Sequence, residues 1–213
     1  MSPPDGPAVL EGLVTVSCET VERLGLFADL LRRWQKADNL VAPDTLPVLW
    51  RRHIADSAQL VRIAPEAKLW LDLGSGGGFP GLVVAILLAD TPGASVTLVE
   101  SNQRKGAFLR RVASETGAPA HVLTGRIEQV VETFDAPVEA VSARALAPLD
   151  RLLDLAQPVL ARGATAYFHK GRDFQREIDE ATKSWSFDLI KHKSLIDDSS
   201  VILEISRLWR EAS

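Results

Sequence analysis

Hydrophobic positions recur with a helical period in the first third of the chain. Between Ser17 and Ala37, apolar residues return every three or four positions, which predicts an amphipathic helix. The Ser17 hydroxyl is suited to cap its first turn. A second helix is predicted from about Pro47 to Ile63, because proline suits a first helical turn and the apolar residues again share one face. Residues 1–16 are rich in proline and glycine and are interpreted as a flexible tail.

From Lys68 onward, short apolar runs alternate with amphipathic segments. Such runs predict strands of a sheet that is covered on both faces. The predicted strands are Leu69–Leu73, Ser95–Val99, His121–Thr124, Ala140–Ala143 and Thr165–His169. The helices predicted to follow them are Pro80–Ala89, Asn102–Thr116, Ile127–Thr133, Leu149–Leu160 and Phe174–Trp185. Successive strand–helix units of this kind predict a parallel sheet with helices on both sides.

The end of the chain follows a different pattern. Phe187–Leu195 and Ser200–Leu208 are strand-like runs, and the link between them is too short to contain a crossover, so the two strands are predicted to be antiparallel. The sequence therefore predicts an α/β fold with a doubly wound, seven-stranded, mostly parallel sheet and an antiparallel C-terminal hairpin. Residues 17–66 are interpreted as an N-terminal helical extension, and residues 67–213 as the domain that contains the sheet.

The composition is that of an ordinary globular protein. Of 213 residues, 46% are hydrophobic and 24% are charged, which excludes a disordered or collagen-like chain. Cys18 is the only cysteine, so a disulfide framework and a cysteine zinc site are excluded. The histidines lie far apart in the sequence, and we predict no metal site. Because there is no secretory signal and no apolar run long enough to span a bilayer, we expect a cytoplasmic protein without membrane contact.

The strongest local motif is a glycine-rich loop that follows the first predicted strand. It contains Gly74, Gly76 and Gly78, where the absence of a Cβ lets the backbone turn tightly and approach a ligand. The loop lies between a strand and a helix, as a nucleotide-binding loop does. Glu100 ends the next predicted strand, and a carboxylate at that place can accept hydrogen bonds from both hydroxyls of a ribose.

The spacing of the glycines fits two classes of ligand. Gly76, Gly78 and Gly81 satisfy the GxGxxG pattern of dinucleotide sites. Asp72 begins an Asp-x-Gly-x-Gly-x-Gly pattern, which is the form used for S-adenosylmethionine. Two features favour this methyl donor: Asp72 is expected to face the cationic amino-acid part of the donor, and dinucleotide folds have no C-terminal hairpin. A nicotinamide-dependent oxidoreductase is the alternative enzyme class.

Motifs that are missing from the chain narrow the choice of methyl acceptor. Methyltransferases of exocyclic amines have Asn/Asp-Pro-Pro-Tyr after the fourth strand, where this chain has Ser142-Ala143-Arg144-Ala145-Leu146. A cytosine C5 enzyme needs a cysteine nucleophile near the fourth or fifth strand. The only cysteine lies in the first helix instead. Ring nitrogens and hydroxyl groups remain as acceptors.

Five motifs occur in a fixed order from about Leu30 to the C-terminus. They are Trp34-Gln35-Lys36-Ala37-Asp38-Asn39-Leu40, Arg52-His53-Ile54-Ala55-Asp56-Ser57, Asp72 to Gly81, Arg144-Ala145 and Lys170-Gly171. Together they resemble the bacterial 16S rRNA guanine-N7 methyltransferases of the RsmG (GidB) family. The resemblance implies a class I, Rossmann-like, S-adenosylmethionine-dependent enzyme that methylates a guanine N7 in the decoding-site region of the small ribosomal subunit.

The resemblance also implies roles for individual residues. The glycine pattern already assigns Asp72, Gly76 and Gly78 to the donor site. The resemblance places the following residues at or beside the donor: Gly74, Phe79, Glu100, Ile127, Glu128 and Arg144. Arg144 and Lys170 follow strand ends at the edge where open α/β sheets bind ligands, and we predict them as the catalytic residues. Guanine N7 has a lone pair and no proton, so its methylation needs positioning rather than a general base.

The RNA side of the site requires cations, because phosphate contacts dominate the affinity for nucleic acid. The net charge of −4 argues against binding by bulk charge, so we expect a local basic face. The predicted RNA contacts are Lys36, Arg52, Arg104, Lys105, Lys170 and Arg172. An alternative role for Asn39, Arg52, His53 and Asp56 is to fix the helical extension against the sheet. The expected partner is 16S rRNA or a small-subunit particle, and we expect the enzyme to bind it as a monomer. Two further alternatives remain. The protein could be a methyltransferase of another RNA, a small molecule or a protein, or it could be an inert RNA-binding module.

Overall fold

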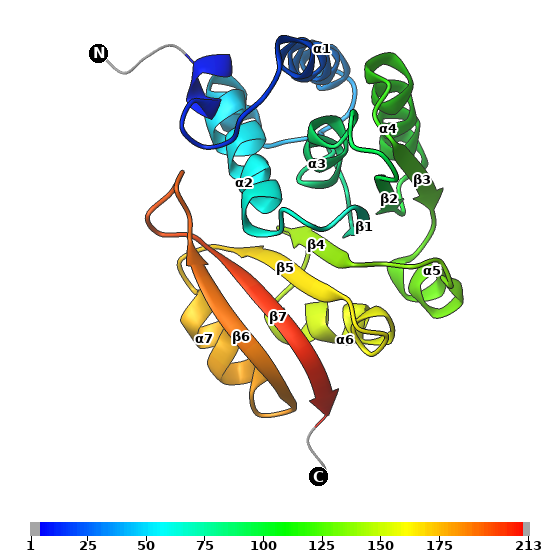
Figure 1. Cartoon of the computed structure of the whole chain (residues 1–213), viewed down its shortest axis with the longest axis vertical. Coiled ribbons are helices and arrows are strands. Elements are labelled where there is room, and N and C mark those ends of the chain that lie inside the picture. Colours follow the sequence, from blue (N-terminus) through cyan, green and yellow to red (C-terminus); the bar gives the residue numbers. More distant parts are fainter. Residues whose placement is uncertain (1–4, 211–213) are drawn as a thin grey trace.

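A computed structural model describes residues 5–210 as a seven-stranded sheet with helices on both faces (Figure 1). The strands are β1 (Leu69–Leu73), β2 (Ser95–Glu100), β3 (Ala120–Thr124), β4 (Ala140–Arg144), β5 (Thr165–Lys170), β6 (Trp185–Lys193) and β7 (Val201–Arg210). They are ordered β3-β2-β1-β4-β5-β7-β6. The first five strands pair in parallel, and β7 pairs antiparallel with both β5 and β6. The predicted sheet and its closing hairpin are confirmed.

The strand order reverses at β1, which pairs with β2 on one side and with β4 on the other. The chain therefore leaves the carboxyl ends of β1 and β4 in opposite directions. Such a switch point opens a crevice at the carboxyl edge, and open α/β sheets bind their ligands there. The fold thus places the glycine loop, which follows β1, at one wall of this crevice.

Two helical layers cover the sheet (Figure 1). One layer contains α1 (Cys18–Trp34), α2 (Asp56–Ile63), α3 (Gly81–Leu87) and α4 (Gln103–Thr116), and the other contains α5 (Ile127–Thr133), α6 (Leu149–Leu160) and α7 (Phe174–Ala181). Each layer packs on its own face of the sheet around its own apolar cluster. Phe27 and Phe108 meet in the first cluster, with ring centroids 6.3 Å apart, whereas Leu153 and Phe168 are buried in the second.

The helical extension shares its core with the rest of the molecule. The Phe27 ring of α1 lies 5.1 Å, between centroids, from the Phe79 ring of the glycine loop. Trp34, at the end of α1, lies 5.6 Å from Phe108 of α4. Residues 17–66 are therefore joined to residues 67–210 by one apolar cluster, and the glycine loop lies against both parts.

Residues 5–16 do not form the flexible tail that their proline and glycine content predicts. The Asp5 carboxylate accepts hydrogen bonds from the backbone N–H groups of Trp50 and Arg51, at 2.8 and 2.9 Å. Pro7–Leu10 form a 3₁₀-helix, and Leu10 is 1% exposed. Two buried leucines, Leu10 and Leu13, and the capping carboxylate of Asp5 dock this segment, although none of them gives a periodic pattern. Residues 1–4 lie outside the described part of the chain.

The helix predicted from Pro47 to Ile63 is composite, and the single-helix prediction was wrong. A 3₁₀-helix covers Pro43–Val48, a π-helix covers Trp50–Ala55, and α2 begins only at Asp56. Single π-turns occur often at functional sites. Here the wide turn includes Arg52 and His53, which both take part in the site described below.

The last predicted helix also ends earlier than expected. α7 ends at Ala181, and Trp185 begins β6 instead of closing the helix. The Trp185 side chain is 3% exposed, and the Arg210 guanidinium lies 4.5 Å from its ring centroid. Packing of this tryptophan against β7 therefore determines where the helix ends and β6 begins. The local periodicity of the sequence does not show this packing.

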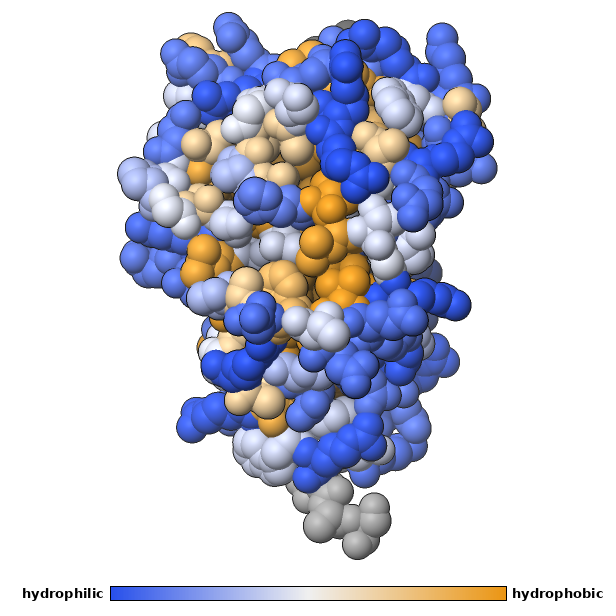
Figure 2. Space-filling model, turned by 90° about the vertical axis from the view of Figure 1, so that its right-hand side faces the viewer, coloured by the Kyte–Doolittle hydropathy of each residue, from blue (hydrophilic) through white to orange (hydrophobic). Residues whose placement is uncertain are grey.

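The β3 side of the molecule is mainly hydrophilic at its margins, and apolar side chains gather near the centre of the view (Figure 2). β3 is an edge strand, and its Leu123 is 38% exposed. Among the helices of residues 5–210, none combines the length and the apolar character that crossing a bilayer requires.

Candidate active site

A cavity of about 680 Å³ lies at the switch point between β1 and β4. Its volume is within the range of small-molecule sites. The glycine loop, the ends of β2 and β4, the first turn of α5 and the segment between α1 and Pro43–Val48 form its walls. Of the predicted donor contacts, those that line it are Gly74, Gly76, Phe79, Glu100, Ile127, Glu128 and Arg144.

The glycine loop is pressed against two of these walls. A Cβ at Gly77 would lie 2.8 Å from the carbonyl oxygen of Leu40, and one at Gly74 would lie 2.7 Å from a methyl group of Leu146. Gly74 also has a φ of +68°, in the region that favours glycine. The loop can take this path only without side chains at these positions, so its backbone faces the cavity directly.

Glu100 is held by the backbone around it. One carboxylate oxygen accepts a hydrogen bond from Gly76 N at 2.8 Å, and the other accepts one from Asn102 N at 2.7 Å. The residue is 7% exposed and lines the cavity. Each carboxylate oxygen has a further acceptor site beyond these bonds. This placement agrees with the predicted role of Glu100, which is to accept hydrogen bonds from sugar hydroxyls.

Asp72 lies below the loop and does not line the cavity, contrary to the expectation that it faces the donor. Its Oδ1 accepts a hydrogen bond from the Ser142 hydroxyl at 2.7 Å, and its backbone oxygen accepts one from the Ser75 hydroxyl at 3.2 Å. Burial raises the pKa of Asp72 to about 6, although these hydroxyls act in the opposite direction. Asp72 thus ties the loop to β4. Gly78 is buried as well and contributes no part of the lining.

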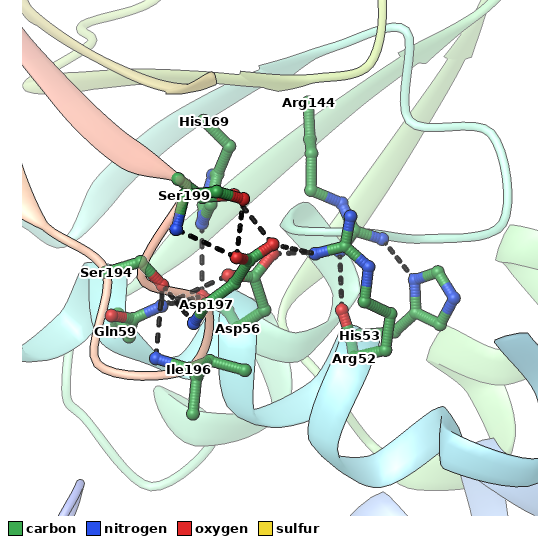
Figure 3. Close-up of polar contacts among 11 residues, drawn as sticks. Arg52, His53, Asp56, Gln59, Arg144, His169, Ser194, Ile196, Asp197 and Ser199 are labelled. Carbon is green, nitrogen blue, oxygen red and sulfur yellow. Dashed lines mark hydrogen bonds and ion pairs between the residues drawn. The ribbon is translucent and has the colours of Figure 1, made fainter. Parts of the chain in front are cut away.

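Arg144, at the end of β4, points into the helical extension (Figure 3). Its Nη1 donates to the carbonyl oxygen of Arg52 and to Asp56 Oδ2, each at 3.1 Å, and its Nη2 lies 2.6 Å from His53 Nδ1. The guanidinium carbon is 5.2 Å from the centroid of the Phe79 ring. Burial lowers the pKa of Arg144, while Asp56 acts to raise it; arginine stays charged in either case. Arg144 therefore joins the sheet, the glycine loop and the π-helix.

The turn between β6 and β7 closes this network from the other side (Figure 3). Gln59 Oε1 accepts from Leu195 N at 2.7 Å, and Gln59 Nε2 lies 3.3 Å from the Ser194 hydroxyl. Arg52 Nη1 is 3.6 Å from Asp197 Oδ2 in the same turn. The alternative that His53 and Asp56 fix the helical extension against the sheet agrees with these contacts, whereas Arg52 is still exposed and stands at the mouth of the cavity.

Lys170 is buried in an ion pair and does not stand free on the surface. Its ammonium group lies 2.5 Å from Glu177 Oε2 and donates to the carbonyl oxygen of Ala147 at 3.0 Å. The same Glu177 oxygen accepts from Leu149 N at 2.8 Å. Glu177 was not predicted as a site residue, because nothing in its local sequence reveals a partner across two elements.

The other predicted RNA contacts are placed in different ways. Lys105 lines the donor cavity, whereas Arg104 pairs with Asp38 at 2.9 Å on the outer surface. Lys36 and Arg172 are exposed. Glu128, at the cavity wall, forms an ion pair with Arg151. The structure therefore does not gather all of these cations on one face of the cavity.

Gln35 was not predicted to act in the site, yet it shapes one wall. Its Oε1 accepts from Leu40 N at 2.9 Å and from Val41 N at 3.0 Å, and its Nε2 donates to Val41 O at 2.8 Å. Leu40 and Val41 line the cavity. The only sequence signal for this role is the position of Gln35 inside the first of the five motifs.

Comparison with known proteins identifies the family. The family described as GidB, rRNA small subunit methyltransferase G, matches residues 20–201. The chain belongs to this family. Curated relatives named ribosomal RNA small subunit methyltransferase G, from Brucella canis and Brucella suis, are each 56% identical to it over 196 residues, which is 92% of this chain and 92% of each relative.

Solved structures of more distant methyltransferases have the same fold as this GidB family member. A Podospora anserina methyltransferase bound to S-adenosylhomocysteine has a TM-score of 0.60 at 13% identity and covers 93% of this chain and 98% of its own. An O-methyltransferase from Bacillus cereus, in complex with S-adenosylhomocysteine, has a TM-score of 0.58 at 15% identity, covering 94% and 96%. At such identities the likeness concerns the fold, and the predicted class I methyltransferase fold is confirmed.

Proposed function

We propose that this GidB family member transfers a methyl group from S-adenosylmethionine to N7 of a guanine in 16S rRNA, in the decoding-site region of the small subunit. The proposal rests on one observation above all. In a chain of this family, a cavity at the strand switch point has the Glu100 carboxylate fixed at its wall, 2.8 Å from the glycine-loop N–H of Gly76.

The residues around the cavity fit a nucleoside methyl donor. Glu100 would accept hydrogen bonds from the ribose hydroxyls, and the bare backbone of Gly74 and Gly76 would adjoin the donor's tail. Ile127 and Leu146 supply apolar surface for a base. Asp72 acts from below, through the loop, as a negative charge behind it. When bound, the donor supplies an electrophilic methyl group on a sulfonium centre.

The chemistry asks the protein mainly to position two reactants. Guanine N7 carries an in-plane lone pair and no proton, so no side chain has to remove one. Orientation alone can contribute about 7–11 kcal/mol to such a reaction. Arg144, whose donors are directed to Arg52, His53 and Asp56, serves here to hold the cavity wall in place, and Lys170 stands at the next strand end along the same edge.

The RNA partner is 16S rRNA or a small-subunit particle. The exposed cations Lys36 and Arg172 contribute phosphate contacts, while Arg52 and Arg104 reach RNA from their pairs with Asp197 and Asp38. We further propose that the enzyme acts as a monomer in the cytoplasm, without membrane contact.

The test is methyl transfer to 30S subunits from a bacterium that lacks its own member of this family. The expected product, found by mass spectrometry of ribonuclease fragments, is a single 7-methylguanosine in the decoding region. Calorimetry with S-adenosylhomocysteine and with NADH checks the ligand class in parallel. Methylation of another nucleotide or of a ribosomal protein, or binding of NADH alone, would overturn the proposal.

A further inference from the structure

A second cavity, of about 250 Å³, adjoins the donor cavity. The two cavities share Arg52, Arg144 and Ala145 in their walls. The second continues along the carboxyl ends of β4 and β5 and reaches Lys170 and Val201. It is large enough for several water molecules, each of which occupies roughly 30 Å³ in the liquid. A molecule in it therefore lies next to a donor in the first cavity.

The cations of this second cavity are already neutralised. Each is ion-paired with a carboxylate at 2.5–3.6 Å: Arg144 with Asp56, Lys170 with Glu177, and Arg52 with Asp197. Asp56 and Glu177 themselves form part of the wall. A phosphate group would thus meet two carboxylates on entering. The charge pattern favours an uncharged ligand that is recognised by hydrogen bonds.

One hydrogen-bonding donor of the wall remains unused. Lys170 has three N–H donors, and within residues 5–210 only two of them find acceptors, at Ala147 O and Glu177. His169 donates through Nε2 to the backbone oxygen of Asp56 at 3.0 Å, and its Nδ1, which has no partner in the same range, is fully buried and does not open to the cavity. The matching ligand therefore presents an uncharged acceptor to Lys170, as the carbonyl oxygen of a nucleobase does.

We propose that the second cavity receives the target guanine and that Lys170 recognises its O6. This inference rests on the proposed function. Guanine presents O6 and N7 side by side on one edge, and lysine pairs well with O6, whereas adenine presents an amino group at that position. An ammonium group that holds O6 therefore selects guanine and also fixes where N7 lies.

The reaction at N7 is balanced without a proton transfer. The N7 lone pair forms the new N–C bond while the S–C bond breaks and its electron pair goes to sulfur. The positive charge of the sulfonium passes to the purine ring. Because Asp56 is paired with Arg144 and Glu177 with Lys170, these groups add no net positive charge beside the cationic ring that results.

The test is a double-mutant cycle, in which the ammonium group of Lys170 and the O6 atom of the target base are removed separately and together. Lys170→Met and the unchanged enzyme are compared on 30S particles reconstituted with ligated 16S rRNA, in which the target is either guanine or 2-aminopurine, which keeps N7 but lacks O6. On guanine, we expect Lys170→Met to lower kcat/KM about 10- to 100-fold. On 2-aminopurine, we expect the two enzymes to be equally slow.

Two further variants separate this role from a structural one. Lys170→Met/Glu177→Gln leaves no unpaired charge, and it should show the same loss on guanine with unchanged affinity for S-adenosylhomocysteine. Lys191→Met removes an exposed lysine of β6 that lines neither cavity, and it should change nothing. Equal losses on both purines, or no loss on guanine, would overturn the inference. No methylation of guanine by the unchanged enzyme would instead refute the proposed function.

Discussion

Nη2 of Arg144 lies 2.6 Å from Nδ1 of His53, and this contact determines which nitrogen of the neutral histidine carries the hydrogen. A guanidinium group can only donate, so Nδ1 accepts. Nε2 then carries the hydrogen and donates to the Thr45 hydroxyl at 2.7 Å. Burial, and then the charge of Arg144, lowers the pKa of His53 to about 3. His53 is therefore a neutral acceptor that orients Arg144, and it is not a base for catalysis.

Arg144→Lys should destabilise the fold by about 3 kcal/mol, because one ammonium group cannot serve Arg52 O, His53 and Asp56 together and Asp56 would lose its partner. Urea unfolding measures the loss. The matched control is Arg176→Lys, since Arg176 has an 83% exposed side chain and lies 4.0 Å from Asp173. A midpoint that does not move in Arg144→Lys would show that these contacts contribute nothing to stability.

Glu100→Gln should weaken donor binding by about 10- to 100-fold. The amide has one acceptor oxygen, so it cannot keep both backbone bonds, at 2.8 and 2.7 Å, and also accept from two sugar hydroxyls. Calorimetry with S-adenosylhomocysteine measures the change. Glu132→Gln, at an exposed position of α5, is the control. Equal affinities of Glu100→Gln and the unchanged protein would exclude Glu100 from the donor site.

The parts of the fold that depend on local pattern could be predicted from the sequence. Periodicity and glycine placement define the strand–helix units, and the Ser17 cap is found as expected, accepting from Thr20 N at 3.2 Å. The glycine loop and Glu100 follow from strand ends that meet at one edge of a parallel sheet. The positions of these elements could be predicted because they depend only on neighbours in the chain or on the direction of the strands.

The charged groups of the site could not be placed in this way. From the sequence, Lys170 is predicted as a free cation, whereas in the structure it is paired with Glu177. Arg144 is predicted as a ligand contact, whereas in the structure its guanidinium group binds His53 and Asp56. Asp72 has a motif position but lies under the loop. Ion pairs between distant elements depend on packing, and packing leaves no periodic signal in a single sequence.

Asp5→Ala should reduce the free energy of unfolding by about 1 kcal/mol, because Asp5 acts as a cap for two N–H groups, Trp50 N and Arg51 N. Thermal or urea unfolding of the full chain measures this. Asp44→Ala removes the carboxylate of an exposed aspartate and provides the comparison. If the two variants unfold alike, the two hydrogen bonds of Asp5 add nothing to stability.

The low pKa of His53 should make stability fall as the pH is lowered from 6.5. Unfolded His53 takes up a proton near pH 6.5, whereas the folded side chain does so only near 3, so acid favours the unfolded chain throughout this interval. Between pH 7 and 5 the contribution is about 2 kcal/mol. His53→Gln should lose that part of the pH dependence in urea titrations, while His121→Gln, at an exposed site, should keep it. Identical slopes in all three proteins would refute the assignment.

Asp72 should make binding of the cationic donor tighten as the pH rises through 6. Burial raises the pKa of this carboxyl to about 6, so it is neutral below that pH and charged above it. A negative charge behind the glycine loop attracts the sulfonium of S-adenosylmethionine more than the neutral sulfur of S-adenosylhomocysteine. Calorimetry at pH 5 and pH 8 should therefore show about a 3- to 10-fold gain for the first ligand and a smaller one for the second. Asp72→Asn keeps an acceptor for Ser142 and should remove the difference between the ligands; its persistence in that variant would mean that another group titrates.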